Sequence, residues 1–211
     1  ANDAFKPVTR YFDRITRPEQ IISSLQQAVQ VMLDPADCGP ACISLSQDIQ
    51  GEVYDYPEEF FKEKIHTIRR SRPDDFQIKE AAELIKKSKK PIIISGGGVF
   101  YSDATKELSD FAKKHNIPVT QTVMGYSTLK KDHSHYLGVI GGLGGKAANN
   151  LSKETDTAIA IGTKLADFTT GSWANFENPD FKLVSINAAR FDANKHMAQA
   201  CLLYTSPSPR D

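Results

Sequence analysis

A short apolar run that ends in three glycines constrains the fold of this chain more than any other feature. Residues Pro91–Ser95 contain three consecutive isoleucines, and Gly96, Gly97 and Gly98 follow directly. An uninterrupted β-branched run is typical of a strand covered on both faces, as in parallel sheets. Three glycines at its carboxyl end let the backbone turn sharply and leave main-chain N–H groups unshielded. The run therefore predicts a parallel α/β sheet with a candidate ligand site at this edge.

Strand and helix patterns alternate through the second half of the chain. Apolar spacing predicts a helix around Ile78–Ile85 and another, capped by Ser102 or Asp103, that runs through Ala112. The other predicted elements are strands at Ile117–Thr122, Thr157–Ile161 and Lys182–Ile186 and a short helix at Ala147–Ser152. This alternation is typical of right-handed βαβ crossovers. We therefore expect a Rossmann-like α/β domain over residues 76–200, an open and mostly parallel sheet with helices on both faces.

Residues 1–50 predict a helix and a strand that belong to a different α/β domain. Thr16 and Glu19 have the spacing of a capping box, in which the glutamate reaches back to the start of the helix. Apolar residues then repeat at helical spacing from Ile21 to Leu33, and Ala41–Leu45 is predicted to be a strand. No partner strand is visible, so we expect the rest of its sheet upstream or in another domain.

Two segments are set apart by composition. Residues 51–75 combine scattered aromatic residues with a basic run at 69–72, and they predict a linker packed over a surface. A polyanion site is the alternative for these arginines. The segment Cys201–Asp211 ends in a Ser/Pro run and resembles translated adaptor or vector sequence. We expect this tail to be non-native and loosely attached, and the missing initiator Met suits a fragment.

Charge and cysteine content exclude several classes of protein. The 26 basic and 26 acidic residues cancel, so no nucleic-acid partner and no polybasic membrane anchor is indicated. No apolar run reaches the ~20 residues that a transmembrane helix needs. Cys38 and Cys42 lack the second pair of ligands that a structural zinc site requires. We therefore expect reduced thiols, no metal site in this chain and a cytoplasmic location.

Glycine-rich strand ends supply the candidate binding residues. The candidate cofactor-binding residues are Gly96, Gly97, Gly98, Met124, Gly125, Gly141, Gly142, Gly144 and Gly145. The first tract is not the dinucleotide fingerprint G-x-G-x-x-G, so it predicts only a corner that favours anions. The last tract is not a P-loop, because Ala147 stands where a hydroxyl should bind magnesium. A nucleotide-binding rim and a purely structural use of the glycines both remain open.

No catalytic residue is predicted from the motifs. The chain has no nucleophile elbow, no H-E-x-x-H motif and no EF-hand loop. His133 and His135 are the best candidates for proton transfer, although their charged loop favours a surface role. Trp173 could line a pocket, but a core or interface aromatic is the simpler interpretation.

The succession of motifs resembles the thiamine-diphosphate enzymes of the acetolactate synthase type. The phrases that carry this resemblance are Gly39–Gln50, Lys90–Gly98, Gln121–Gly125, Gly138–Gly145, Ala158–Asp167 and Leu183–Asn187. In that family the end of a pyrimidine-binding domain passes through a linker into a Rossmann-like central domain. Gln47–Glu52, Tyr54–Pro57 and Ser185–Asp192 are similar to the inositol-catabolism branch, the trihydroxycyclohexanedione hydrolases. The resemblance covers about residues 5–200.

The resemblance implies that the parent enzyme uses thiamine diphosphate and Mg²⁺ to cleave a ring C–C bond of a cyclic 1,2-dione with water. The family's activating glutamate would precede Ala1 and its metal motif would follow Ala200, so this chain alone is expected to be inactive. The parent is expected to be a homo-oligomer. The synthase branch carries FAD at the glycine rim, whereas the hydrolase branch is not expected to need it, which would leave that pocket vestigial. The alternatives are an FAD-containing carboligase fragment and a non-enzymatic nucleotide-binding module.

Overall fold

A computed structural model describes residues 2–68 and 72–203 of the chain, which divides into two compact units between residues 69 and 70. The division falls within the predicted linker. Most of the basic run, residues 69–71, lies outside the described residues, and so does the tail from residue 204 onward.

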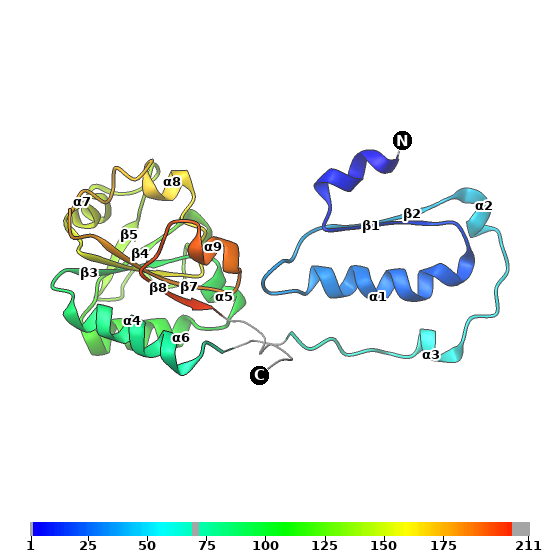
Figure 1. Cartoon of the computed structure of the whole chain (residues 1–211), viewed down its shortest axis with the longest axis horizontal. Coiled ribbons are helices and arrows are strands. Elements are labelled where there is room, and N and C mark those ends of the chain that lie inside the picture. The colour runs from blue at the N-terminus through cyan, green and yellow to red at the C-terminus, as the bar shows by residue number, and fades with distance from the viewer. Residues whose placement is uncertain (1, 69–71, 204–211) are drawn as a thin grey trace. The chain divides into compact units, whose positions relative to one another are not determined.

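The first unit is a parallel two-stranded sheet with one long helix beside it (Figure 1). Its elements are η1 (Asn2–Val8), β1 (Tyr11–Ile15), η2 (Pro18–Gln20), α1 (Ile21–Met32), β2 (Ala41–Leu45), α2 (Gln47–Gln50) and α3 (Glu58–Phe61). β1 pairs with β2 so that Tyr11 lies opposite Ala41 and Ile15 opposite Leu45. The expectation that the 41–45 strand has no partner in this segment is therefore wrong. The sequence pattern does not reveal β1, because Tyr-Phe-Asp-Arg-Ile does not alternate clearly between apolar and polar residues.

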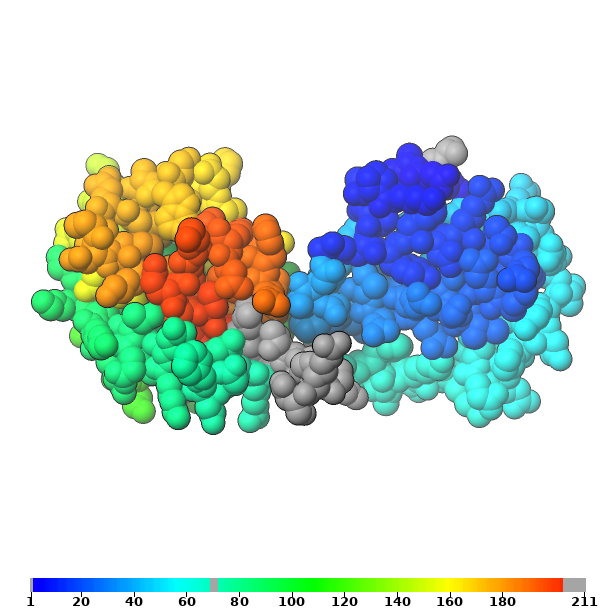
Figure 2. Space-filling view, viewed as in Figure 1, coloured from blue at the N-terminus to red at the C-terminus, as the bar shows by residue number. Residues whose placement is uncertain are grey.

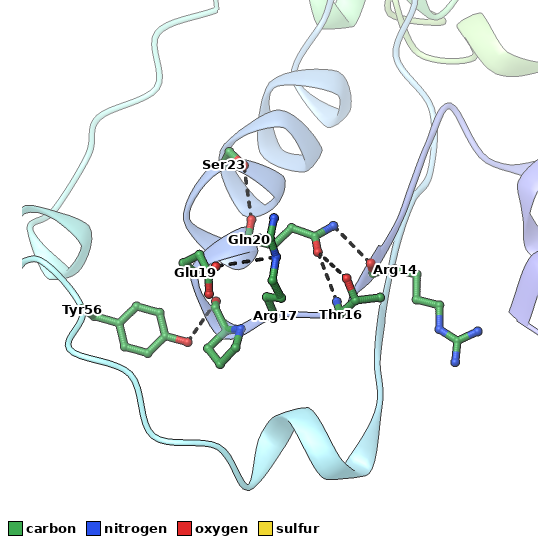
Figure 3. Close-up of polar contacts among 8 residues, drawn as sticks. Arg14, Thr16, Arg17, Glu19, Gln20, Ser23 and Tyr56 are labelled. Carbon is green, nitrogen blue, oxygen red and sulfur yellow. Dashed lines mark hydrogen bonds and ion pairs between the residues drawn. The ribbon is translucent and has the colours of Figure 1, made fainter.

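The turn before α1 is closed by Gln20, and the predicted capping box is wrong (Figure 3). The side-chain oxygen of Gln20 accepts a hydrogen bond from the backbone N–H of Thr16 at 3.1 Å. Glu19 instead forms an ion pair with Arg17, at 3.6 Å between Oε1 and Nε. The reason is local: a 3-10 turn precedes the α-helix, which begins only at Ile21. The side chain that bonds back to Thr16 is therefore that of Gln20, four residues later, and not that of Glu19, three residues later.

An aromatic cluster holds part of the predicted linker against the first unit. The ring of Tyr56 lies 4.9 Å from that of Tyr54 and 5.5 Å from that of Phe60, measured between centroids. The Tyr56 hydroxyl donates a hydrogen bond to the carbonyl oxygen of Pro18 at 3.2 Å (Figure 3). This part of the linker is thereby fixed to the turn that precedes α1.

The second unit is a six-stranded parallel sheet in the order β5-β4-β3-β6-β7-β8 (Figure 1). Its strands are β3 (Pro91–Ser95), β4 (Val119–Gln121), β5 (Tyr136–Val139), β6 (Thr157–Ile161), β7 (Lys182–Asn187) and β8 (Ala200–Leu203). Its helices are α4 (Asp75–Lys87), α5 (Gly98–Tyr101), α6 (Thr105–His115), η3 (Val123–Gly125), α7 (Lys146–Glu154), α8 (Asp167–Thr170) and α9 (Arg190–Asn194). The predicted α/β fold with an open parallel sheet is confirmed.

The central strand β3 is buried on both faces, which explains its uninterrupted isoleucines. Ile93 packs with Ala81 of α4 and Leu108 of α6 in one core. Ile92 and Ile94 point to the opposite face, into a second core beneath α7 and the aromatic segment before β7. All three isoleucines are completely buried. Side chains that alternate across a strand need such cover on both faces, because neither face is left for water.

Three features of this unit correct the predictions. β5 is not among the strands predicted from the sequence, because its Gly138, with a φ of +97°, obscures the strand pattern. α6 begins after Ala104, and neither Ser102 nor Asp103 caps it, because Asp103 has a φ of +54°. The expectation that Cys201 belongs to a loosely attached tail is wrong, because this residue lies in β8 opposite Ser185 of β7. The ordered sheet therefore extends beyond residue 200.

Among residues 2–68 and 72–203, no helix combines the length and the apolar composition needed to cross a bilayer.

Candidate functional site at the carboxyl edge of the sheet

The predicted glycine tracts all lie at the carboxyl edge of the six-stranded sheet. One tract follows β3, Met124 and Gly125 belong to η3 after β4, and the last tract follows β5. The order of strands reverses its direction between β3 and β6, and ligands of open α/β sheets bind in the crevice at such a point. The structure thus brings the three predicted segments to one edge.

Main-chain contacts fill the crevice between β3 and β6. The amide of Gly96 donates to the carbonyl oxygen of Ile161 at 2.8 Å, and the amide of Gly98 donates to that of Gly162 at 2.9 Å. A Cβ placed on Gly96 would lie 2.3 Å from the Gly162 oxygen, and one on Gly98 would lie 2.6 Å from the Gly162 Cα. These glycines are therefore required by the close approach of two backbones, which is the packing alternative left open by the sequence.

The tract after β5 packs in the same way against α8. Gly141 has a φ of +98°, and a Cβ there would lie 2.0 Å from the carbonyl oxygen of Phe168. The Gly141 amide donates to Oδ1 of Asn149 in α7 at 2.9 Å, and Nδ2 of Asn149 donates back to the Gly141 carbonyl at 3.1 Å. The amides of Gly142, Gly144 and Gly145 donate to the carbonyl oxygens of Phe168, Gly141 and Val139. This loop is therefore held by hydrogen bonds within itself and by hydrogen bonds to α7 and α8.

The third segment is equally close to the backbone of β3. The Gly125 amide donates to Oγ1 of Thr122 at 3.0 Å, and a Cβ on Gly125 would lie 2.2 Å from the Ser95 oxygen. The side chain of Met124 points outward and is 75% exposed. Seven of the nine candidate residues therefore donate their amides within the domain, namely Gly96, Gly98, Gly125, Gly141, Gly142, Gly144 and Gly145. Few main-chain donors are left at this rim for an anion.

A buried polar network at the end of β4 shapes the adjoining loop. Gln121 is almost completely buried, and its Nε2 donates to the carbonyl oxygen of Leu129 at 2.9 Å. Its Oε1 accepts from the amide of Ser127 at 3.2 Å. Oγ1 of Thr128 and Oγ of Ser95 share a hydrogen bond of 2.6 Å. The polar residues Gln121 and Thr122 at the strand end can be recognised in the sequence. The role of Thr128 cannot, because this residue lies in a stretch without periodicity.

A hollow of about 260 Å³ lies beside this network. Its lining residues are Gln121, Tyr126, Ser127, Leu129, Lys130 and Lys131. The Lys131 ammonium lies 5.4 Å from the centre of the Tyr126 ring, and a hydrogen bond with Tyr126 raises the pKa of this lysine. The volume is below the range of about 300–1,000 Å³ that is usual for ligand pockets.

His133 and His135 lie before β5, and hence at the opposite edge of the sheet from the glycine tracts. Nε2 of His133 is 3.2 Å from Oγ of Ser109 in α6, and its Nδ1 accepts a hydrogen bond from the amide of His135 at 3.2 Å. Burial lowers the pKa of His133, and the charges of Lys113 and His135 add to this shift. Nε2 of His135 lies 2.9 Å from Oδ1 of Asn116. The two histidines tie a loop to α6, which supports the surface interpretation.

Trp173 belongs to an aromatic cluster that covers the second core. Its ring centroid lies 5.3 Å from that of Phe176 and 4.8 Å from that of His196, and the ring of Phe181 stacks on that of Phe176. Ser172 and Trp173 have positive φ angles of 54° and 69°, which hold the indole over this cluster. The structure therefore supports the interpretation of Trp173 as a packing residue.

The part of the chain that the structure describes contains no group of three or more His, Cys, Asp or Glu side chains that could hold a metal ion. Cys38, Cys42 and Cys201 are free cysteines.

Comparison with known families decides the assignment of the second unit. A sequence profile of the family described as thiamine pyrophosphate enzyme, central domain, matches residues 78–207. The chain belongs to the thiamine pyrophosphate enzymes. The match begins in α4 and includes all six strands of the parallel sheet. The six-stranded unit is therefore the central domain of such an enzyme.

Individual thiamine pyrophosphate enzymes match more of the chain. It is 48% identical over 194 residues to the 3D-(3,5/4)-trihydroxycyclohexane-1,2-dione hydrolase of Clostridium perfringens and 48% identical to the protein of that name from Bacillus licheniformis. Each alignment covers 92% of this chain and 30% of the relative. The chain thus spans about 30% of the length of the curated relatives that it matches. The resemblance to the hydrolase branch is confirmed.

The described residues offer no donor set that fits a magnesium diphosphate, the group that the resemblance implies for the complete enzyme. Mg²⁺ binds a diphosphate through carboxylate and carbonyl oxygens in octahedral geometry. Asp167, the first acidic residue after β6 in the chain, accepts a hydrogen bond from Oγ of Ser172 at 2.9 Å. Within the described ranges no cluster of acidic side chains offers the remaining ligands. No step of thiamine chemistry is therefore assigned to these residues.

Proposed function

We propose that this chain is the central portion of a longer thiamine-diphosphate-dependent hydrolase. The complete enzyme adds water to a cyclic 1,2-dione and cleaves a ring C–C bond, in the catabolism of inositol. The observation that carries this proposal is the identity of 45–48% over 92% of the chain to proteins named as trihydroxycyclohexanedione hydrolases. The similarity extends well beyond the central domain, because 194 aligned residues exceed the second unit alone.

Within that enzyme the six-stranded domain acts as a scaffold that supplies no catalytic residue. Thiamine diphosphate and Mg²⁺ are held by other parts of the polypeptide. The glycine rim, at Gly96–Gly98, Met124–Gly125 and Gly141–Gly145, is a vestigial nucleotide pocket, and the internal hydrogen bonds of its amides support this assignment. The enzyme is proposed to be a cytoplasmic homo-oligomer without a nucleic-acid or membrane partner, and the balanced charge of residues 1–211 agrees with this.

Cofactor dependence in the full-length enzyme tests this proposal. The enzyme is stripped of thiamine diphosphate and divalent metal, and opening of the cyclic dione is followed by mass spectrometry. We expect ring opening to be lost and then restored when both cofactors are added together. Residues 1–211 alone should give no product under the same conditions. Ring opening that persists without thiamine diphosphate would contradict the proposal.

A further inference from the structure

The connection between β4 and β5 crosses the domain almost without a helix. Neighbouring parallel strands need a crossover of about a dozen residues or more, and this crossover is usually an α-helix. The crossover from β7 to β8 carries α9, for example, which lies at the surface of the domain (Figure 2). Between β4 and β5, where every residue from 122 to 135 is described, only the three residues of η3 are helical. The shape of this crossover therefore depends on turns and on polar contacts at its two ends.

The end at the carboxyl edge of the sheet is fixed by groups that do not titrate. The buried amide of Gln121 accepts a hydrogen bond from the Ser127 amide at 3.2 Å and donates to the Leu129 carbonyl oxygen at 2.9 Å. Oγ1 of Thr128 donates to the carbonyl oxygen of Gly125 at 2.8 Å. Amide and hydroxyl side chains keep their protonation state between pH 5 and 8. This end is therefore expected to be insensitive to pH.

The end at the amino edge is fixed by His133. Its Nδ1 accepts a hydrogen bond from the backbone N–H of His135, and its Nε2 lies 3.2 Å from Oγ of Ser109 in α6. Because Nδ1 accepts, it carries no proton. Two backbone hydrogen bonds close the turn, from the His133 amide to the Lys130 carbonyl oxygen and from the Tyr136 amide to that of His133. Tyr136 is the first residue of β5, so this turn sets where the strand begins.

A second proton on the ring of His133 is incompatible with this arrangement. In an imidazolium both ring nitrogens are donors, so the Nδ1–H would face the N–H of His135 with no acceptor between them. The surroundings act in the same direction. Burial is the largest cause that lowers the pKa of His133, Lys113 of α6 and His135 of the same turn add to it, and Asp132 and a hydrogen bond with Ser109 oppose it.

His135 has no such conflict. Its Nε2 lies 2.9 Å from Oδ1 of Asn116, and its Nδ1 lies 2.9 Å from Oγ of Ser134. Both oxygens can accept a hydrogen bond, so a ring that carries a proton on each nitrogen keeps both contacts. Mild acid therefore acts differently on the two histidines, and only His133 must give up a hydrogen bond when it is protonated.

We propose that residues 130–135 form a pH-sensitive latch, in which protonation of His133 releases the amino-edge end of the crossover from α6. The hydrogen bond with the His135 amide is lost, while the Gln121 end stays in place. Release frees the start of β5, an edge strand that is paired only with β4. Local openings of this kind cost less free energy than global unfolding. The latch is closed near pH 7.5, and the open form gains population as the pH falls below the ordinary pKa of histidine, about 6.5.

Hydrogen exchange in the full-length enzyme measures this release. Amide exchange is followed by mass spectrometry between pH 7.5 and pH 5.5, and protection factors correct each peptide for the intrinsic dependence of exchange on pH. Because only the open form takes up the proton, opening is favoured about tenfold one pH unit below the ordinary pKa. We expect the protection factor of residues 130–136 to fall about five- to tenfold. That of residues 123–129, at the Gln121 end, should fall less than about twofold.

Two variants identify the group that titrates. In His133→Asn the side-chain Oδ1 stands about where Nδ1 stood and accepts from the same amide without taking up a proton, so the fall in protection should be abolished. His135→Gln is the matched control and should keep the fall seen in the wild type.

The two peptides of the wild-type enzyme decide the outcome even where a variant does not fold. Equal falls in protection at residues 130–136 and 123–129, or no fall at either, would overturn the latch. The wild-type fall in a folded His133→Asn enzyme would also overturn it. The readout involves no catalysis, so a full-length enzyme that fails to open the dione would refute the proposed function and leave the latch standing.

Discussion

The backbone of Gly96 lies directly against the backbone of Gly162. A Cβ on Gly96 would come within 2.3 Å of the Gly162 carbonyl oxygen, and Gly162 itself has a φ of +60°. Because main chain stands on both sides of this contact, neither side can move without displacing β3 or β6. The place where an open α/β sheet ordinarily receives a ligand is thus used to join two strands.

Replacement of Gly96 by alanine should therefore destabilise the domain. We expect Gly96→Ala to lower the free energy of unfolding by about 1–3 kcal/mol, because an added methyl in a packed site forces the backbone apart. Gly145→Ala is the matched control, since a Cβ at this position would meet no heavy atom within 4 Å. Its effect should stay within about 1 kcal/mol. Urea denaturation, followed by the fluorescence of Trp173, the single tryptophan of residues 1–211, measures the free energy of unfolding of both variants. Equal losses in the two variants would contradict the close contact.

Flavin should not bind at the glycine rim. Seven of its amides are already donated within the domain, so the phosphates of FAD would find few main-chain donors. We expect titration of the full-length protein with FAD to leave flavin fluorescence unchanged. Saturable quenching with one flavin per chain would favour the carboligase alternative instead.

Asp13 should stabilise the first unit through its hydrogen bonds. Its carboxylate accepts from the Ser24 hydroxyl, from Nε2 of Gln20 at 2.9 Å and from the amide of Arg14 at 2.8 Å. Asp13→Ala leaves the buried Ser24 hydroxyl without this acceptor, so we expect a loss of about 1–3 kcal/mol at pH 7. Asp48→Ala, at an exposed site, should change stability by less than about 0.5 kcal/mol.

The contribution of Asp13 should also depend on pH. The hydrogen bond from Ser24 lowers the pKa of Asp13, although burial opposes the shift. A carboxyl whose pKa is lowered by folding stabilises the protein above its ordinary value of about 3.9, and this stability is lost as the pH falls through the folded pKa. The difference in melting temperature between wild type and Asp13→Ala should therefore shrink below about pH 4. A difference that stays constant down to pH 2.5 would contradict the assignment.

His133 should make the second unit less stable in mild acid. Burial lowers its pKa, with Lys113 and His135 adding to the effect, so the unfolded chain binds its proton more readily than the folded one. The stabilising contribution of neutral His133 is then fully present above about pH 6.5, and it decreases as the pH falls below that value. Between pH 7.5 and pH 5.5 the free energy of unfolding, measured by urea denaturation, should fall less in His133→Gln than in the wild type. His66→Gln, at an exposed site, is the control. The same decrease in the free energy of unfolding in all three proteins would exclude His133 as the source.

The strands with strong apolar runs could be predicted from the sequence, and those without could not. A run such as Ile92–Ile94 is buried on both faces and is readily recognised as a strand. The strands β2, β3 and β6 begin and end at the predicted residues. β1 contains Asp13, whose carboxylate is satisfied by α1, and β5 contains Gly138 in a conformation unlike a regular strand. In both strands a tertiary contact, not the local pattern, supports the strand.

The location of the candidate site was predictable, but the use of its glycines was not. A glycine signals that space beside its Cα must be empty, and the sequence cannot say whether a ligand or a backbone occupies it. At Gly141 the occupant is the carbonyl oxygen of Phe168, a residue 27 positions later that carried no signal of its own. The spacing within each tract was visible, but the partner of each tract was not.

The identity of the product formed by the full-length enzyme distinguishes a hydrolase of the cyclic dione from a carboligase. The enzyme, supplied with thiamine diphosphate and Mg²⁺, is given the trihydroxycyclohexanedione in one reaction and pyruvate in another, and both products are identified by mass spectrometry. We expect a ring-opened product heavier than the dione by one water, with no acetolactate from pyruvate. Acetolactate from pyruvate, together with an intact dione, would contradict it.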